Sequence, residues 1–195
     1  MAYDFPNSPT IGQRVTMPDS TVRSWDGTKW RASSATGSYT AGTVNIVGRA
    51  IGPVGNGLDT TEDTLLSVTV PGGTVAVAGQ TLHAMSWGST SSGSINRILK
   101  CYYGVDLLGT LNLTGTQFDW WLDMMIMRTN TGAQLYMSHW QEGPDGAITG
   151  GRILTRGVGG QDFNNSLNVR VTGQTTGSSA GNNIIADALI VELMG

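Results

Sequence analysis

Apolar and polar residues alternate with a period of two in many short stretches of this chain. In residues 65–70, leucine and valine alternate with serine and threonine, which is typical of a strand with one face in a core and the other nearer to water. Pro71-Gly72-Gly73 then ends the strand, because proline has no N–H to donate and glycine turns freely. No segment has an apolar pattern of period 3.6 over three turns. The sequence therefore predicts an all-β chain.

Similar strand-like segments recur to the C-terminus with turn residues between them. Eight or so strands in a domain of about 150 residues are typical of an antiparallel β-sandwich. The predicted strands cover residues 44–51, 65–70, 81–87, 95–103, 107–113, 118–128, 133–141, 166–172 and 183–193, with weaker strands near Ile153 and Val158.

Residues 1–34 form a separate unit. Two strand-like runs, 21–25 and 29–31, flank Asp26-Gly27-Thr28, which predicts a short hairpin. Because a hairpin of this size is not stable alone, it must pack on the following sandwich, on another subunit or on a partner protein. Residues 35–42, rich in small and polar side chains, are expected to be a linker, and residues 43–195 the sandwich domain.

The run 120–127 is apolar on both of its faces, although only one face can meet the sandwich interior. An exposed second face would form an apolar patch of the kind that marks an interface, and burying each such side chain contributes about 1.5–3 kcal/mol. The run 133–141 is similarly two-sided. We therefore expect self-association, with the alternative that the N-terminal hairpin or a loop covers this face within one subunit. The predicted interface residues are Trp121, Met125, Met127, Met137 and Trp140.

Composition excludes several classes of protein. Charged residues make up 13% of the 195 residues, the net charge is −3 and there is no basic block, so no nucleic-acid groove is expected. Cys101 is the only cysteine, which excludes a disulfide within the chain. The N-terminus lacks a basic region followed by an apolar run, and no apolar stretch approaches the ~20 residues of a membrane helix. We expect a soluble protein made in a cytoplasm.

The histidines and acidic residues of the chain do not form a catalytic or metal-binding motif. Neither His83 nor His139 has metal-ligand spacing to other ligand residues, and His83 is expected to be packed or hydrogen-bonded in a strand. Asp59, Glu62 and Asp63 with loop carbonyls are a candidate Ca²⁺ site, but their spacing does not fit an EF-hand loop, so a solvated strand edge is favoured. No cofactor or metal is expected.

For two tryptophans and two glycine runs, a ligand-binding role competes with a purely structural one. Trp87 and Trp140 can stack on sugar rings, although packing in a core or an interface is favoured for both. The glycine runs at 150–151 and 157–160 have no following helix to hold a phosphate, so they are expected to be turns.

Several runs resemble a jelly-roll domain that is widespread in virion proteins of tailed phages, including head fibres, collar proteins and tail fibres. Residues 59–73 resemble its opening, and Lys100-Cys101-Tyr102-Tyr103-Gly104 resembles its Lys-x-x-(Tyr/Phe)-Gly element. Residues 121–134 resemble a strand followed by its "Arg-Thr-Gly" turn, and residues 171–174 and 191–193 its last two strands. Residues 39–57 have no counterpart that can be placed, and the usual Asn/Ala-rich loop is Ser/Gly-rich here.

The beginning of the chain resembles a second phage element. Residues 4–13, with residues 25–30, are similar to a short module common in phage structural proteins. The resemblance implies that this module attaches the protein to the particle. The predicted anchoring residues are Phe5, Pro6, Trp25 and Trp30.

Together these resemblances imply a TNF-like jelly roll that forms a homotrimer on the outside of a virion. The favoured function is a non-enzymatic head decoration, spike or short fibre whose partners are itself and capsid, collar or tail proteins. The alternative is an adhesin that binds a host-surface glycan through the loops 88–94, 143–146 and 173–183. An enzyme such as a depolymerising spike is disfavoured, because the sequence has neither long solenoid repeats nor a carboxylate cleft.

Overall fold

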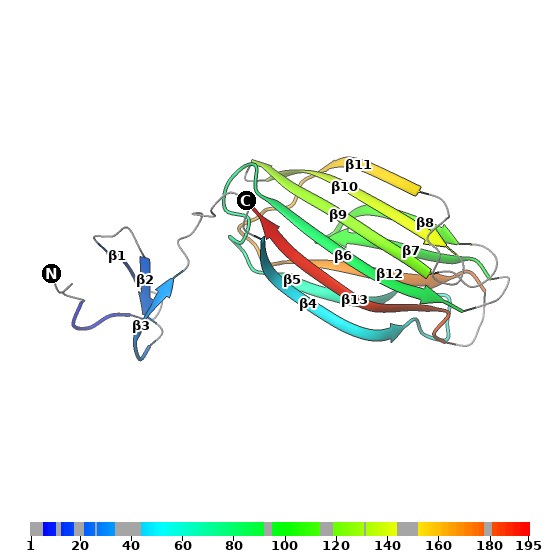
Figure 1. Ribbon diagram of the computed structural model, residues 1–195, viewed down its shortest axis with the longest axis horizontal. Helices are drawn as coiled ribbons and strands as arrows, with labels where there is room; N and C mark the ends of the chain where they lie inside the picture. The colour runs from blue at the N-terminus through cyan, green and yellow to red at the C-terminus, as the bar shows by residue number, and fades with distance from the viewer. Residues whose placement is uncertain are drawn as a thin grey trace. The chain divides into compact units, whose positions relative to one another are not determined.

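The computed structural model describes most of the chain and divides it into two compact units, Met1–Thr40 and Ala41–Gly195. Both units are built from strands (Figure 1), as the sequence predicts. The part of the chain that is described contains no helix, and therefore none long and apolar enough to cross a membrane. The described residues are 6–10, 13–17, 22–25, 27–33, 44–91, 95–113, 119–130, 132–143, 152–177 and 181–195.

The first unit is a small antiparallel sheet with the order β1-β2-β3. The predicted hairpin is confirmed: β2 (Val22–Trp25) pairs with β3 (Trp30–Ser33), and Trp25 lies directly opposite Trp30. Gly27 has a φ of 99° in the turn, a conformation that glycine adopts without a steric cost. A third strand, β1 (Arg14–Thr16), pairs with β2 and was not predicted.

The second unit is a sandwich of two antiparallel sheets. The inner faces of the two sheets are apolar. Along the strands, residues that face the core alternate with residues that face outwards. The strands in the described part of this unit are β4 (Val44–Gly55), β5 (Asp63–Val70), β6 (Thr81–Thr90), β7 (Arg97–Tyr103), β8 (Asp106–Leu113), β9 (Asp119–Asn130), β10 (Ala133–Gly143), β11 (Arg152–Gly159), β12 (Leu167–Thr175) and β13 (Ile184–Met194).

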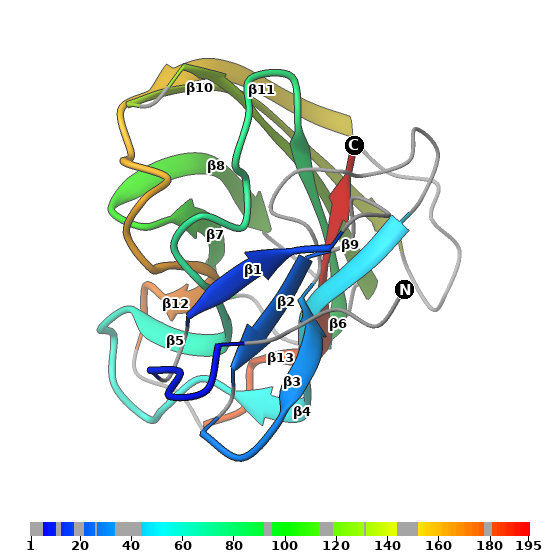
Figure 2. The ribbon, with the colours of Figure 1, turned by 90° about the vertical axis from the view of Figure 1, so that its left-hand side faces the viewer.

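The strand order is that of a jelly roll. One sheet has the order β11-β10-β9-β6-β13-β4 and the other β5-β12-β7-β8. In a jelly roll, eight strands wind into two four-stranded sheets through two Greek keys, and β4-β13-β6-β9 facing β5-β12-β7-β8 is that arrangement. The hairpin β10–β11 is an addition that widens one sheet to six strands. Figure 1 shows the six-stranded sheet in front, and Figure 2 shows the four-stranded sheet on the left.

Two details differ from the sequence prediction. The predicted loop at 52–57 is partly strand, because β4 continues through a cis Gly52–Pro53 peptide bond and pairs Val54 with Ala186. Ile153 and Val158 belong to one strand, β11, instead of two weak ones. The expectation that residues 157–160 form a turn is wrong for 157–159, which belong to β11. An added Cβ at Gly157 would lie 2.2 Å from the Tyr136 Oη atom, so the Tyr136 side chain would have to move.

The prediction that Trp140 is an interface residue is wrong. Its side chain is 0% exposed and points into the core, where its ring centroid lies 6.0 Å from that of Trp120. The reason is the alternation of side chains along a strand. Met137 and Trp140 are three positions apart, and residues separated by an odd number lie on opposite faces of a strand.

The single cysteine is also part of the core. Cys101 on β7 is 0% exposed, and its Sγ atom lies 3.7 Å from the Gly109 carbonyl oxygen. Burial raises the pKa of this thiol far above its usual value. The thiol is therefore neutral and packed, as expected for a small apolar core side chain.

Candidate interaction surface

The outer face of the six-stranded sheet carries an apolar patch where β9 and β10 lie side by side. The register sets Met127 opposite Leu135 and Met125 opposite Met137. Val158 on β11 continues the row beyond Leu135. Met125 is 37% exposed, Leu135 44% and Val158 73%. We call these five residues the outer apolar patch.

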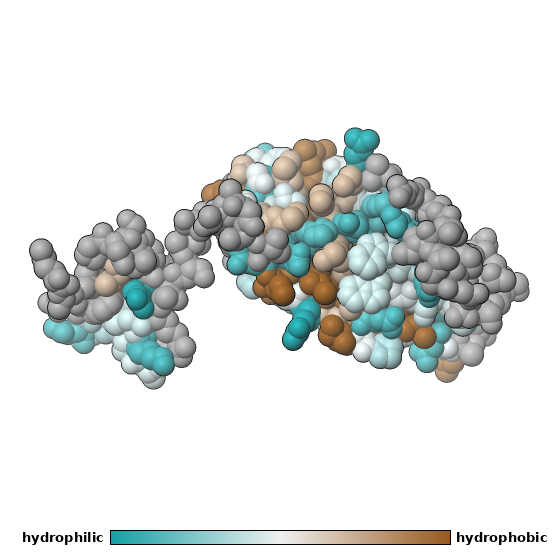
Figure 3. Space-filling model, in the orientation of Figure 1, coloured by the Kyte–Doolittle hydropathy of each residue, from teal (hydrophilic) through white to brown (hydrophobic). Residues whose placement is uncertain are grey.

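The outer apolar patch borders a hollow of about 290 Å³. Three of the predicted interface residues, Met125, Met127 and Met137, line it, while Arg156 adds a positive charge. Figure 3 shows this face of the sandwich, on which apolar side chains lie among polar ones. The lining residues are Thr81, Met125, Met127, Leu135, Tyr136, Met137, Arg156 and Gly157.

Trp121, the fourth predicted interface residue that faces outwards, lies further along the same face. It is directly opposite Trp87 on β6. The two half-buried indole rings are nearly parallel, with an interplanar angle of 11° and centroids 5.5 Å apart. The prediction that one face of β9 is buried and the other lies outside the core is confirmed, because exposure alternates along the strand.

His83 is held between two carboxylates on this face. Its Nε2 atom lies 2.9 Å from Asp123 Oδ1 on β9, and its Nδ1 atom lies 3.5 Å from Glu192 Oε2 on β13. The His83 side chain is 17% exposed. The expectation that His83 is hydrogen-bonded is therefore confirmed. The other histidine, His139, lies opposite Asp123 in the β9–β10 register, so both histidines of the chain share this face.

The predicted anchoring residues lie in the first unit, and the structure brings two of them together. The ring centroids of Trp25 and Trp30 are 5.6 Å apart at 56°. Pro6 is exposed, and Phe5 lies outside the described residues. The anchoring role of these residues stays a prediction.

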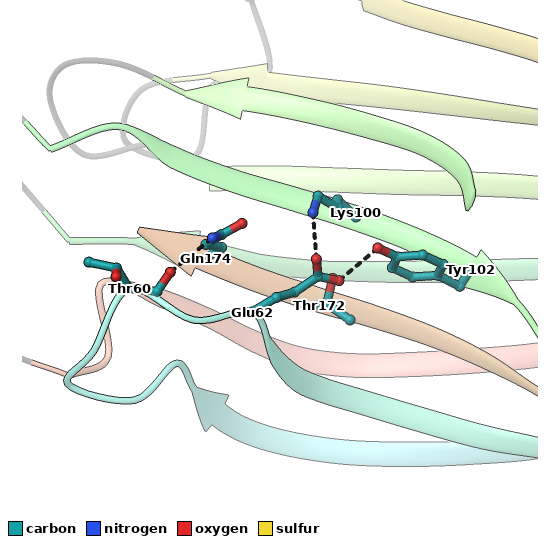
Figure 4. Close-up of polar contacts among 6 residues, drawn as sticks. All are labelled: Thr60, Glu62, Lys100, Tyr102, Thr172 and Gln174. Atoms are coloured by element: carbon teal, nitrogen blue, oxygen red, sulfur yellow. Dashed lines mark hydrogen bonds and ion pairs between the residues drawn. The ribbon is translucent and has the colours of Figure 1, made fainter. Parts of the chain in front are cut away.

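The outer face of the four-stranded sheet carries a polar cluster instead (Figure 4). The Glu62 carboxylate accepts hydrogen bonds from the Lys100 ammonium, from the Tyr102 hydroxyl at 2.8 Å and from the Thr172 hydroxyl at 2.7 Å. Partial burial raises the pKa of Glu62, but the hydrogen bonds from Lys100, Thr172 and Tyr102 together lower it more, so the net pKa lies below its usual value. Burial and the neighbouring Glu62 raise the pKa of Tyr102 to about 12.

The three carboxylates weighed as a Ca²⁺ site have separate partners. Asp59 accepts from the Thr61 amide at 2.8 Å and hydroxyl at 2.6 Å, and Asp63 accepts from the Gly57 amide at 2.7 Å. Among the residues that the structure describes, no group of three His, Cys, Asp or Glu side chains could hold a metal ion. Glu62 is also more than a solvated strand edge, because it connects β5 to β7 and β12.

Comparisons with known proteins add little to this description. No family model matches the chain, and no curated protein matches it. A match among solved structures is the structure of infectious bursal disease virus Gt strain, with 10% sequence identity and a TM-score of 0.32. The match covers 92% of this chain and 41% of that chain, so this chain spans less than half of the length of the protein it matches.

Proposed function

We propose that this chain is a non-enzymatic structural protein of a tailed-phage virion. It assembles as a homotrimer through the outer face of the six-stranded sheet and is attached to the particle by its N-terminal unit. In this role it is a head decoration, a spike or a short fibre. The observation that carries the proposal is the outer apolar patch.

The physical support is the exposure of apolar side chains that a lone protomer leaves in water. Met125 and Leu135 are each more than a third exposed, and together with Met127 and Met137 they surround one hollow. Burial of such a side chain contributes about 1.5–3 kcal/mol. A contiguous apolar face of this kind marks an interaction surface, and closed cyclic symmetry is the usual outcome of self-association.

The support for a virion role comes from the sequence resemblance together with the jelly-roll topology. The resembling runs 59–73, 100–104 and 121–134 fall on β5, on β7 and its following turn, and on β9 with the turn to β10. The resemblance takes residues 59–73 as the opening of the domain, whereas an earlier strand, β4, precedes them in this sandwich. Fold alone does not determine function, so the virion role depends on these motifs.

Self-association is tested by sedimentation velocity on the full chain at micromolar concentration. We expect a species of three copies, and we expect Met125→Glu to dissociate it, because a buried unpaired charge is costly. The matched control is Ser67→Glu, at an exposed position on the outer face of the other sheet, which should leave the trimer intact. A wild-type chain that sediments as a single protomer would contradict the proposal.

Attachment to the particle is tested by removing residues 1–34. The remaining sandwich should still form trimers but should no longer bind particles that lack the protein. Cryo-EM of intact particles would locate the chain and count its copies. Binding that persists without residues 1–34 would argue against the anchoring role.

A second candidate function, a glycan-binding adhesin, is favoured by one observation. The parallel, half-buried indoles of Trp87 and Trp121 lie on an outer face, with Gln141 opposite Trp121 as a hydrogen-bonding group. Binding on a glycan array that Trp87→Ala abolishes would support this function, and an array without binding would count against it. Release of new reducing ends from host polysaccharide would instead indicate an enzyme.

A further inference from the structure

The cluster His83–Asp123–Glu192 lies on the same outer face as the outer apolar patch. His83 is directly opposite Met125 in the β6–β9 register, and Glu192 is opposite His83 in the β13–β6 register. Any copy that covers the outer apolar patch therefore comes close to this cluster. The cluster contains one basic group and two acidic groups, joined by the contacts of 2.9 Å and 3.5 Å described above.

Each of the other five strands of this sheet carries a charged or titratable side chain on the face of His83. β6 itself has no further charged residue. Asp123 lies on β9 and Glu192 on β13, while His139 on β10 lies on the other side of Asp123. Two arginines stand further out: Arg156 on β11, opposite Met137, and Arg49 on β4, opposite Ile190.

A neutral imidazole has one N–H and can donate to only one of the two carboxylates, whereas a protonated imidazole donates to both. Two carboxylates with a neutral His83 carry a formal charge of −2, and protonation of His83 changes this to −1. Burying charge in an interface costs desolvation energy and sets like charges of neighbouring copies against each other. Histidine is the side chain that ordinarily changes charge between pH 5 and 8.

We propose that His83 makes self-association through this face pH-dependent, so that the assembly tightens as the pH falls from neutral towards 5.5. The inference rests on the proposed self-association. Protonation of His83 lowers the net charge that the interface must bury, and it satisfies Glu192 as well as Asp123. His83 is thus a residue that tunes the assembly, between two carboxylates that belong to the same protomer.

The experiment is sedimentation equilibrium of the full chain at pH 7.5, 6.5 and 5.5 and constant ionic strength. For the wild type we expect the apparent dissociation constant to fall by about tenfold or more between pH 7.5 and 5.5. His83→Gln should reduce this change to about threefold or less, while the matched control His139→Gln should keep most of it. Thermal melts at each pH establish that every variant is folded.

Asp123→Asn provides an independent check. Removing one of the two negative charges should tighten the assembly at pH 7.5 and weaken its response to pH. If the wild type stays fully assembled at the lowest measurable concentration, the same series is measured in a Met125→Ala background, in which the interface is weaker.

The outcomes separate the two proposals. A lone wild-type protomer at all three pH values would contradict the self-association and with it the role of His83. An assembly through this face that does not respond to pH, or one whose response survives His83→Gln, would overturn only the role of His83.

Discussion

Glu62 joins three strands through one carboxylate, because it precedes β5 and accepts hydrogen bonds from Lys100 on β7 and Thr172 on β12. Its pKa is lowered in the folded state, so its stabilising contribution is present above the unfolded pKa of about 4.5 and is lost as the pH falls through the folded pKa. We expect Glu62→Gln to cost about 1 kcal/mol at pH 7, a modest value because water screens this partly exposed group.

The measurement is urea unfolding of the wild type and Glu62→Gln at pH 7 and at pH 3, where the difference between them should shrink. A double-mutant cycle with Lys100→Met isolates the ion pair from the other two hydrogen bonds. A difference that is the same at both pH values would contradict the assigned charge state of Glu62.

Gly88 on β6 is a position where the core leaves no room for a side chain. An added Cβ would lie 1.9 Å from the Ile185 carbonyl oxygen and 2.6 Å from a ring carbon of Trp120. We expect Gly88→Ala to destabilise the sandwich by about 1–3 kcal/mol or more, because backbone or a large buried ring must shift. Gly132→Ala, where an added Cβ meets nothing within 4 Å, should change stability by about 0.5 kcal/mol or less in the same thermal melts.

At the scale of an element, the two faces of β9 have different surroundings, and the proposed assembly involves only the outer one. Leu122 points into the core and is 0% exposed, whereas Met125 points outwards. We expect Leu122→Ala to lower the free energy of unfolding by about 2–5 kcal/mol. Met125→Ala should leave the unfolding of the protomer nearly unchanged and instead weaken self-association, measured by sedimentation. Equal effects of both substitutions on unfolding would contradict this division.

The strands were predictable from sequence because each alternates apolar and polar residues and ends at turn residues. The face of β9 that avoids the core was predictable for the same reason. The error at Trp140 arose from treating β10 as apolar without applying the same alternation, which sets Trp140 and Met137 on opposite faces. Here the sequence already contained the information.

Other features were beyond sequence reasoning because they depend on long-range pairing. The partners of Glu62 are 38 to 110 positions away along the chain, and no local pattern brings them together. The position of His83 beside Asp123 and Glu192 likewise requires the strand order β9-β6-β13. The extra strand β11 was obscured by its glycines, because the side chain that lies over Gly157, that of Tyr136, is known only from the pairing of β10 with β11.

At the scale of the whole molecule, the chain consists of two units, and each described strand pairs only within its own unit. β4 begins directly after the boundary and pairs with β13, near the C-terminus. We therefore expect a fragment of residues 41–195 to fold without the first unit. Calorimetry should show one cooperative transition within about 2 °C of the sandwich transition in the full chain. A fragment that unfolds broadly or aggregates would contradict this independence.

Because Cys101 is completely buried, the reactivity of its thiol can report on local opening of the sandwich. A thiol reagent cannot reach the Sγ atom until β7 separates from the strands around it, so labelling of the native protein should be slower than that of a free thiol by a factor of about 10³ or more. When reclosing is faster than labelling, the rate is proportional to the population of the open form. Covering the outer face of the opposite sheet with neighbouring copies should slow this labelling, which would let one natural sulfur atom report on assembly from inside the protein.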